Sequence, residues 1–330
     1  MNWLKSKAVR AALGLLAGVT MSVSSAHAET NKIRLLLDWA WLPYHSPFLI
    51  AQQKNYYRDA GLDVTLEQGR GSASTALLLA QGQFDIAHLN ITNAAQMIGK
   101  GGAIKVVSIY QHKSGASFVG IKGKVKLDGP KSLIGLKIGS TPGGSDGLSL
   151  KIFGKTSGID ASKLNIISLD ANAKTAALFG GKIDVVSGDA PAFNSYVRAT
   201  GQEPETLLLS DYGLPLIGFG FAVNDDFLAK NPETVKKFLA ATKKAFQDEE
   251  KDIAAACALM AKEVHLAGDQ KRCVDYSKGI FALSTSPGAN DWGMQTEAEW
   301  KALTETLRSV GELESDKPIS DYYTNDFVAK

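Results

Sequence analysis

Alternating apolar runs and segments with helical spacing predict an α/β protein from about residue 33 onward. Strands are expected at 33–37, 62–66, 82–88, 104–110, 135–139, 164–169, 181–186 and 216–223. Helices are expected at 46–60, 72–79, 92–99, 146–156, 173–179 and 234–250, with a loop region at 279–292. This alternation is typical of mostly parallel sheets flanked by helices on both faces.

The pattern begins again in the second half of the chain. Residues 82–86 and 181–185 match in type, and the polar residues Asn90 and Asp189 follow them at the same spacing of 99 residues. A short repeat of this kind favours two similar lobes, each with a polar loop after the equivalent strand. The expected division is lobe 1 at 29–113 and 216–330, with lobe 2 at 114–215.

The first 28 residues have the features of a cleavable signal peptide. Basic residues precede a short apolar stretch at 11–21, and Ala26-His27-Ala28 fits a cleavage site before Glu29. The apolar stretch is too short for a permanent membrane anchor, and no cysteine lies near the cleavage site to carry a lipid. We therefore expect an exported protein in the periplasm.

Removal of the signal changes the charge of the chain. The whole sequence has a formal charge of +2, and losing the three basic residues of the signal leaves −1. Such a chain lacks the basic field expected of a nucleic-acid or anionic-membrane binder.

The sequence contains two cysteines, Cys257 and Cys273. An even number in an exported chain favours a disulfide, with two separate buried thiols as the alternative. Their spacing, without a histidine cluster, does not fit a zinc site.

The stretch after the first expected strand is the most unusual in the chain. It contains Asp38, Trp39, Trp41, Tyr44 and His45 within eight residues. Open α/β sheets bind ligands at the carboxyl ends of their strands. A carboxylate there suits an amine or amidine, and tryptophans suit a flat or cationic group, so these five residues are candidate ligand contacts. The alternative is that the two tryptophans belong to the core.

Two glycine- and serine-rich loops, at 69–74 and 139–145, precede expected helices. Free backbone N–H groups at a helix N-terminus can hold an anion, although a simple capped helix explains each loop equally. The remaining candidate ligand-binding residues are Gly71, Ser72, His88, Asn90, Gln111, Ser140, Thr141, Gly143, Gly144, Ser145 and Asp189.

Local catalytic motifs are lacking. The sequence has no H-E-x-x-H pair, no G-x-S-x-G elbow and no Walker loop. It therefore predicts a chain that is not an enzyme and that needs no cofactor and no metal.

Several of these motifs together resemble one family. The opening loop, the stretches 61–64 and 82–85, and the Asn231-Pro232-Glu233 helix start are similar to the periplasmic solute-binding proteins of ABC importers. The similar group includes the binders of thiamine pyrimidine precursors and those of sulfonates and taurine. Asp38-Trp39, His45 and the stretch 51–57 are closest to the pyrimidine-precursor branch.

The resemblance implies a two-lobe periplasmic binding protein fold of the type II kind, with the ligand in the cleft between the lobes. It implies a monomer that delivers a flat nitrogen heterocycle to an ABC permease and its ATPase. The alternatives are an alkanesulfonate, taurine or other small anion as ligand, or an enzyme of the same fold. The chain departs from the family at Asn55-Tyr56-Tyr57, where Gly-Tyr-Phe is usual, and it lacks the cysteine-rich iron-binding motif of the eukaryotic pyrimidine synthases.

Overall fold

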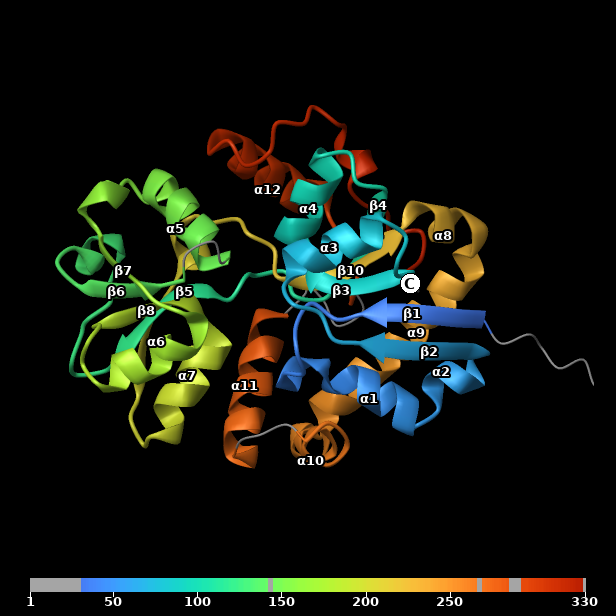
Figure 1. Ribbon diagram of the computed structural model, residues 1–330, viewed down its shortest axis with the longest axis horizontal. Helices are drawn as coiled ribbons and strands as arrows, with labels where there is room; N and C mark the ends of the chain where they lie inside the picture. Colours follow the sequence, from blue (N-terminus) through green and yellow to red (C-terminus); the bar gives the residue numbers. More distant parts are fainter. Residues whose placement is uncertain (1–30, 142–144, 266–268, 285–291, 329–330) are drawn as a thin grey trace, which may run out of the picture.

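The computed structural model describes residues 31–141, 145–265, 269–284 and 292–328, and it contains two five-stranded sheets (Figure 1). The first sheet has the order β2-β1-β3-β10-β4 and the second the order β7-β6-β8-β5-β9. The strands are β1 Asn31–Leu36, β2 Leu62–Glu67, β3 Ile86–Asn90, β4 Ile104–Ile109, β5 Ala116–Ile121, β6 Lys137–Ser140, β7 Asn165–Ser168, β8 Val185–Asp189, β9 Pro204–Leu208 and β10 Phe219–Asn224. The predicted α/β class with two mixed, mostly parallel sheets is confirmed.

Both sheets are wound in the same way. In the first, β10 lies between β3 and β4 and runs antiparallel to both. In the second, β5 lies between β8 and β9 and is antiparallel to both. The chain thus leaves the first sheet after β4, builds the whole second sheet and returns as β10. The exact lobe boundaries at 113/114 and 215/216 stay a prediction.

Helices cover both faces of each sheet (Figure 1). They are α1 Ser46–Gln53, α2 Tyr56–Asp59, α3 Ser72–Ala80, α4 Ile91–Gly99, α5 Ser145–Thr156, α6 Ala171–Phe179, α7 Ala190–Ala199, α8 Asp225–Lys230, α9 Pro232–Lys251, α10 Ile253–Glu263, α11 Gln270–Leu283 and α12 Glu297–Ser309. Short 3₁₀ turns are η1 Pro43–His45, η2 Pro130–Leu133, η3 Ala161–Lys163, η4 Leu209–Tyr212 and η5 Ile319–Asp321.

Four of the expected elements need correction. The single helix expected at 46–60 is two helices, because Asn55 adopts a left-handed φ of 60° between them. The strands expected at 82–88 and 181–186 start only at Ile86 and Val185, since a turn precedes each of them. The loop expected at 279–292 begins later, because α11 continues through Gly279 to Leu283.

The 99-residue echo has a structural cause. Gly82 and Gly181 have φ values of +70° and +68°, which favour glycine at these turns before β3 and β8. After each turn an aspartate side chain accepts a hydrogen bond from a backbone N–H of the neighbouring strand. The N–H groups of Arg34 and Lys137 donate at 2.8 Å to Asp85 and at 2.7 Å to Asp184, respectively. The repeated motif therefore fixes the entry of a strand.

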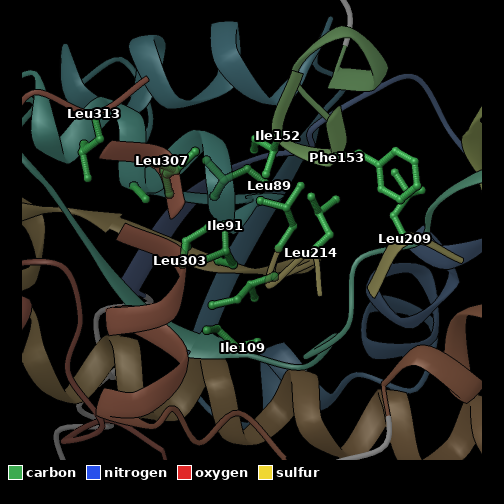
Figure 2. Packing of buried hydrophobic residues seen from close by; sticks show 14 of the residues in the cluster. Leu89, Ile91, Ile109, Ile152, Phe153, Leu209, Leu214, Leu303, Leu307 and Leu313 are labelled. Atoms are coloured by element: carbon green, nitrogen blue, oxygen red, sulfur yellow. The ribbon is translucent and has the colours of Figure 1, made fainter. Parts of the chain in front are cut away.

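One hydrophobic cluster runs through both sheets (Figure 2). It contains Leu89, Ile91 and Ile109 from the first sheet region and Ile152 and Phe153 from the second. Burial of such side chains contributes about 1.5–3 kcal/mol each, so the two sheets share part of their stabilisation.

The two connections between the sheets also pair with each other. The Gly218 N–H donates to the Gln111 carbonyl at 3.0 Å, and the Ser114 N–H donates to the Leu216 carbonyl at 3.0 Å. The two connecting segments are therefore hydrogen-bonded to each other between the two sheets.

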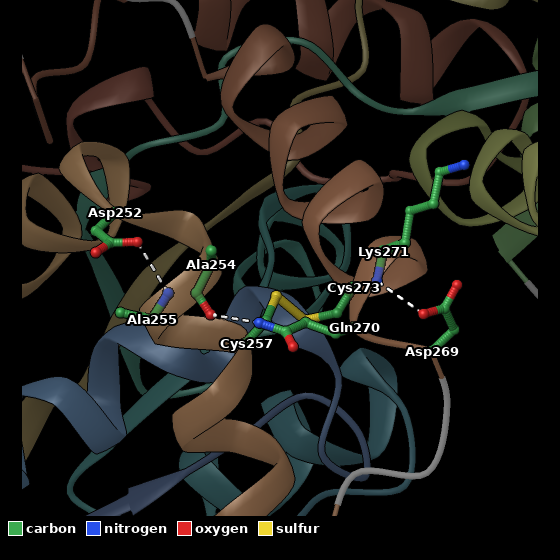
Figure 3. Close-up of a disulfide and its surroundings, with 8 residues drawn as sticks. All are labelled: Asp252, Ala254, Ala255, Cys257, Asp269, Gln270, Lys271 and Cys273. Atoms are coloured by element: carbon green, nitrogen blue, oxygen red, sulfur yellow. Dashed lines mark hydrogen bonds between the residues drawn. A yellow bond between two sulfur atoms is a disulfide. The ribbon is translucent and has the colours of Figure 1, made fainter.

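The predicted disulfide is present. Cys257 on α10 and Cys273 on α11 are joined with an S–S distance of 2.04 Å and a Cα–Cα distance of 5.9 Å (Figure 3). It ties α11 to the helices of the first sheet. The expected signal peptide at 1–28 lies outside the described residues. Within the described ranges, no helix is both long enough and apolar enough to cross a bilayer.

Candidate functional site

A buried carboxylate marks the end of the first strand. Asp38 lies just beyond β1, is 5% exposed, and accepts three side-chain hydrogen bonds. Tyr44 Oη donates to one oxygen at 2.9 Å, while His45 Nε2 and His88 Nδ1 donate to the other at 2.8 and 3.0 Å. The 3₁₀ turn η1 places Tyr44 and His45 against Asp38, and β3 supplies His88. Residues up to 50 positions apart in sequence thus meet around one charge.

The hydrogen bonds define the protons on both imidazoles. The Leu42 N–H donates to His45 Nδ1 at 3.1 Å, so the proton of a neutral His45 is on Nε2, facing Asp38. His88 directs Nδ1 at the carboxylate and Nε2 at Tyr110 Oη, at 2.8 Å. If Tyr110 Oη donates to His88 Nε2, every donor in this series of hydrogen bonds has an acceptor. In that arrangement the donors around the carboxylate are two imidazole N–H groups and one phenol O–H.

The electrostatics bear on the charge of Asp38. Burial opposes its ionisation, but the hydrogen bonds from His45 and His88, with a further electrostatic contribution from both imidazoles, outweigh it and hold the pKa of Asp38 well below its ordinary value. Burial also lowers the pKa of His45, which outweighs the attraction of Asp38 for an imidazolium. The site consequently carries a buried negative charge.

The same three residues are the candidate metal ligands of the described chain. One donor atom each from Asp38, His45 and His88 lies within 4.8 Å of the others. Ligation through His45 Nε2 would require its proton to move to Nδ1, where the Leu42 N–H already points. The hydrogen-bond pattern therefore favours a carboxylate cage over a metal centre. Iron held by cysteine thiolates does not fit either, because Cys257 and Cys273 are joined as a disulfide.

Aromatic rings enclose the cluster on one side. Phe219, at the start of β10, stacks on Tyr44 with a centroid distance of 5.0 Å and on His88 at 5.2 Å. Trp41 meets the ring of His45 edge-on at 5.9 Å. Trp39 is 46% exposed, so the alternative that it belongs to the core does not describe its position.

Several other candidates organise the first sheet. An added Cβ on Gly71 would lie 3.6 Å from the Trp39 ring, so this glycine borders the exposed tryptophan. Ser72 Oγ accepts from the Asn90 N–H at 3.0 Å, and the Asn90 side chain caps α4. The amide of Gln111 is buried, and neither its oxygen nor its nitrogen has a hydrogen-bond partner among the described residues.

The segment after β6 in the second sheet leads to another buried carboxylate, Asp146 in the first turn of α5. Asp146 Oδ2 accepts from Ser140 Oγ at 3.2 Å, from the Thr141 N–H at 2.8 Å and from Lys174 Nζ at 3.0 Å. Lys174 donates to the Ser187 carbonyl as well, at 3.0 Å. Asp146 and Lys174 thus form a buried ion pair that sequence reasoning missed, since no local pattern joins residues on α5 and α6.

The glycine- and serine-rich loop at 139–145, expected to hold an anion, is described only in part. Gly143 and Gly144 lie outside the described residues, while Ser145 is the first residue of α5. A ligand role for this loop stays a prediction.

Asp189, at the end of β8 in the second sheet, interacts electrostatically with Asp38 of the first sheet. It caps α7 by accepting from the Ala192 N–H at 3.2 Å, as Asn90 caps α4 in the first sheet. The stretch around Asp189, expected to be a polar loop, is instead the end of β8 and the start of α7. Burial, with the charge of Asp38 as a further contribution, raises the pKa of Asp189 to about 7. Asp38 and Asp189 therefore repel each other across the region between the sheets.

The structure brings Asp38, Tyr44, His45 and His88 into direct contact, and sequence reasoning named all four. It missed Phe219, which lies in the strand expected at 216–223, and Tyr276, which lies after the last expected helix. Their aromatic character was visible, but nothing in the sequence placed them near residue 38. Whether the candidate residues contact a ligand remains a prediction.

Comparisons with known proteins agree with this fold. The NMT1/THI5-like family model matches residues 42–252. The alkanesulfonate-binding protein SsuA from Xanthomonas axonopodis pv. citri, bound to MOPS, has 16% identity and a TM-score of 0.66, over 92% of this chain and 100% of that chain. The periplasmic aliphatic sulphonate binding protein SsuA from Escherichia coli has 15% identity and a TM-score of 0.70, over 88% and 96%. The fold is that of the periplasmic binding proteins.

Curated relatives are named as enzymes. The 4-amino-5-hydroxymethyl-2-methylpyrimidine phosphate synthase THI11 of Saccharomyces cerevisiae is 26% identical over 230 residues, which cover 66% of each chain, just under two thirds. The synthase of the same name from Aspergillus parasiticus is 24% identical over 312 residues, covering 91% of this chain and 88% of that protein.

These names contradict the expectation that the chain is not an enzyme. That expectation depended on local catalytic motifs, and the buried Asp38 cluster forms from residues that no local motif joins. The fold and the family both support a solute-binding role. Because the family model matches more than half of its length, the chain belongs to the NMT1/THI5-like family.

Proposed function

We propose that this chain binds a small, flat, basic nitrogen heterocycle of the thiamine pyrimidine class between its two sheets. In this proposal the chain is exported to the periplasm and delivers the ligand to an ABC permease and its ATPase. The observation that carries the proposal is the buried, ionised Asp38, whose side-chain hydrogen bonds in the described chain come from one tyrosine and two histidines and from no lysine or arginine. A buried negative charge without a cation favours a ligand that supplies one.

Two further features support a basic ligand. Burial raises the pKa of Asp189 to about 7, because it disfavours the charged form of this carboxyl group. A cationic or amino partner would stabilise that charged form. Trp39 leaves nearly half of its ring exposed at the end of β1, where a flat ring can stack on it. A sulfonate would instead have to approach two carboxyl groups.

The relatives support the chemical class. The curated relatives are named for 4-amino-5-hydroxymethyl-2-methylpyrimidine phosphate, an aminopyrimidine. The structural neighbours are named as periplasmic binding proteins for sulfonates, which supports capture and delivery but not the same ligand.

Titration calorimetry tests the proposal. The mature chain is titrated with 4-amino-5-hydroxymethyl-2-methylpyrimidine and with an alkanesulfonate. Asp189→Asn should weaken pyrimidine binding by about tenfold to a hundredfold, because a charge-assisted hydrogen bond contributes about 1.5–3 kcal/mol. Asparagine can still cap α7, as Asn90 caps α4, so folding should be preserved.

Asp170→Asn is the matched control. Asp170 lies in the same sheet region at the start of α6, is exposed, and makes no side-chain cap hydrogen bond. It should leave both affinities unchanged. Binding of the sulfonate without binding of the pyrimidine would replace the proposed ligand class with the anionic alternative.

A pyrimidine phosphate synthase is the second candidate, favoured by the names of the curated relatives. The continuous chain from Tyr110 through His88 to Asp38 is of the kind that can move a proton. Expression without residues 1–28 in yeast lacking THI5, THI11, THI12 and THI13 tests it. Growth without thiamine would support the synthase, and recovery of chemically unchanged ligand from the purified protein would favour the binder.

A further inference from the structure

Helix α11 stands between the two sheets (Figure 1). One face of it packs against α7 of the second sheet. Four residues with helical spacing belong to this face: Arg272, Asp275, Tyr276 and Gly279. The Arg272 guanidinium lies 4.7 Å from the ring centre of Tyr196, and Arg198 donates to Asp275 at 3.0 Å. A Cβ on Gly279 would lie 3.0 Å from Pro191, so the two helices approach closely there.

Tyr276 is the residue of this face that also reaches the Asp38 cluster. It is 4% exposed, and its ring meets Tyr44 edge-on at a centroid distance of 6.0 Å. Burial raises the pKa of Tyr276 well above its ordinary value, and the nearby charges of Asp189 and Asp38 raise it further. The hydroxyl is therefore held protonated within electrostatic reach of both carboxyl groups.

The hydroxyl of Tyr276 makes no hydrogen bond with any residue in the described ranges. The two carboxyl groups that raise its pKa take hydrogen bonds from other donors. Asp38 accepts three side-chain donors, and Asp189 accepts the Ala192 N–H that caps α7. The hydroxyl is therefore available to donate to an acceptor atom of a ligand.

We propose that Tyr276 orients the bound ligand by donating its O–H to an acceptor atom of the ligand ring. This inference rests on the proposed binding function and narrows its ligand class. A ligand that donates an amino group to Asp189 and accepts from Tyr276 needs an amino substituent and a ring nitrogen on one edge. An aminopyrimidine has both, whereas a simple aryl amine has only the donor.

Tyr276→Phe tests the assignment, because it removes the hydroxyl and keeps the ring that packs on Tyr44. Calorimetry uses 4-amino-5-hydroxymethyl-2-methylpyrimidine and the benzene analogue in which carbon replaces both ring nitrogens. The variant should bind the pyrimidine about tenfold more weakly and the benzene analogue as wild type does. The melting temperature should stay close to that of the wild type, since no protein hydrogen bond is lost.

Tyr212→Phe is the matched control for this change. Tyr212 is half-buried on η4 and packs near Gly129, outside the proposed site, so both affinities should remain at the wild-type values. Equal pyrimidine affinity of wild type and Tyr276→Phe would overturn the role of Tyr276 and leave the proposed function intact. Failure of the wild type to bind the pyrimidine would instead overturn the proposed function.

Discussion

The segments that follow β1 in the first sheet and β6 in the second hold a buried carboxylate in two different ways. After β1, Asp38 is surrounded by two histidines and a tyrosine, and in the described chain no lysine or arginine pairs with it. After β6, Asp146 pairs with Lys174, and the charges cancel. The two sheets share their winding and their strand entries, so the difference lies in the chemistry of these loops. It makes the first sheet the side that favours a cationic ligand.

The largest expected effect comes from breaking the ion pair of the second sheet. Lys174→Met leaves Asp146 charged and unpaired, which should lower the free energy of unfolding by about 3–5 kcal/mol. Urea denaturation measures the loss. The double variant Lys174→Met/Asp146→Leu should recover much of it, because it removes both charges. A double variant no more stable than the single one would show that Asp146 is not charged in the native state.

The equivalent change in the first sheet should cost less. Asp38→Asn removes the charge but keeps one oxygen for the histidine donors, so a loss of about 1–3 kcal/mol is expected in the same assay. Binding of a basic heterocycle should fall with it. A loss larger than that of Lys174→Met would mean that a histidine beside Asp38 is protonated and that the cluster is itself an ion pair.

The pH dependence of the free energy of unfolding distinguishes Asp189 from Asp38. The pKa of Asp189 is raised to about 7, so the native state holds its proton more tightly and stability falls as the pH rises from about 4 to 7. The slope is at most about 1.4 kcal/mol per pH unit for this group. Asp189→Asn should flatten the profile in that window.

Asp38 has the opposite sign. Its pKa is lowered, so its contribution is complete above about pH 4 and is lost only as the pH falls further. Thermal melts of wild type and Asp189→Asn from pH 3 to 8 provide the measurement. An unchanged slope between pH 4 and 7 would place Asp189 in an ordinary aqueous setting.

Much of the fold could be predicted from the sequence, because apolar periodicity and the glycine turns before β3 and β8 are local signals. Asp38, Tyr44 and His45 could be grouped as well, since they lie within one loop. Asp146 and Lys174 could not be paired, because they lie on two different helices with β7 between them in the chain, and only the winding of the sheet brings them together. The position of Tyr276 beside the Asp38 cluster could not be predicted either, since it depends on how α11 packs against α7.

The smallest effect on stability is expected at the exposed tryptophan. Trp39→Ala should change the free energy of unfolding by less than about 0.5 kcal/mol, as is usual for surface positions. It should weaken binding of a flat heterocycle about tenfold through loss of stacking, which calorimetry measures. Trp300→Ala offers the contrast, because Trp300 is fully buried and its loss should cost about 3–5 kcal/mol.

The central claim is that the Asp38 cluster consists of one carboxylate and two neutral histidines. Nitrogen-15 NMR of protein labelled at histidine measures this directly, with His45→Gln and His88→Gln used to assign the signals. At pH 7 the account predicts neutral rings, with the proton on Nε2 of His45 and on Nδ1 of His88. Imidazolium shifts at either residue would contradict it, because the first sheet would then hold a neutral ion pair like the second.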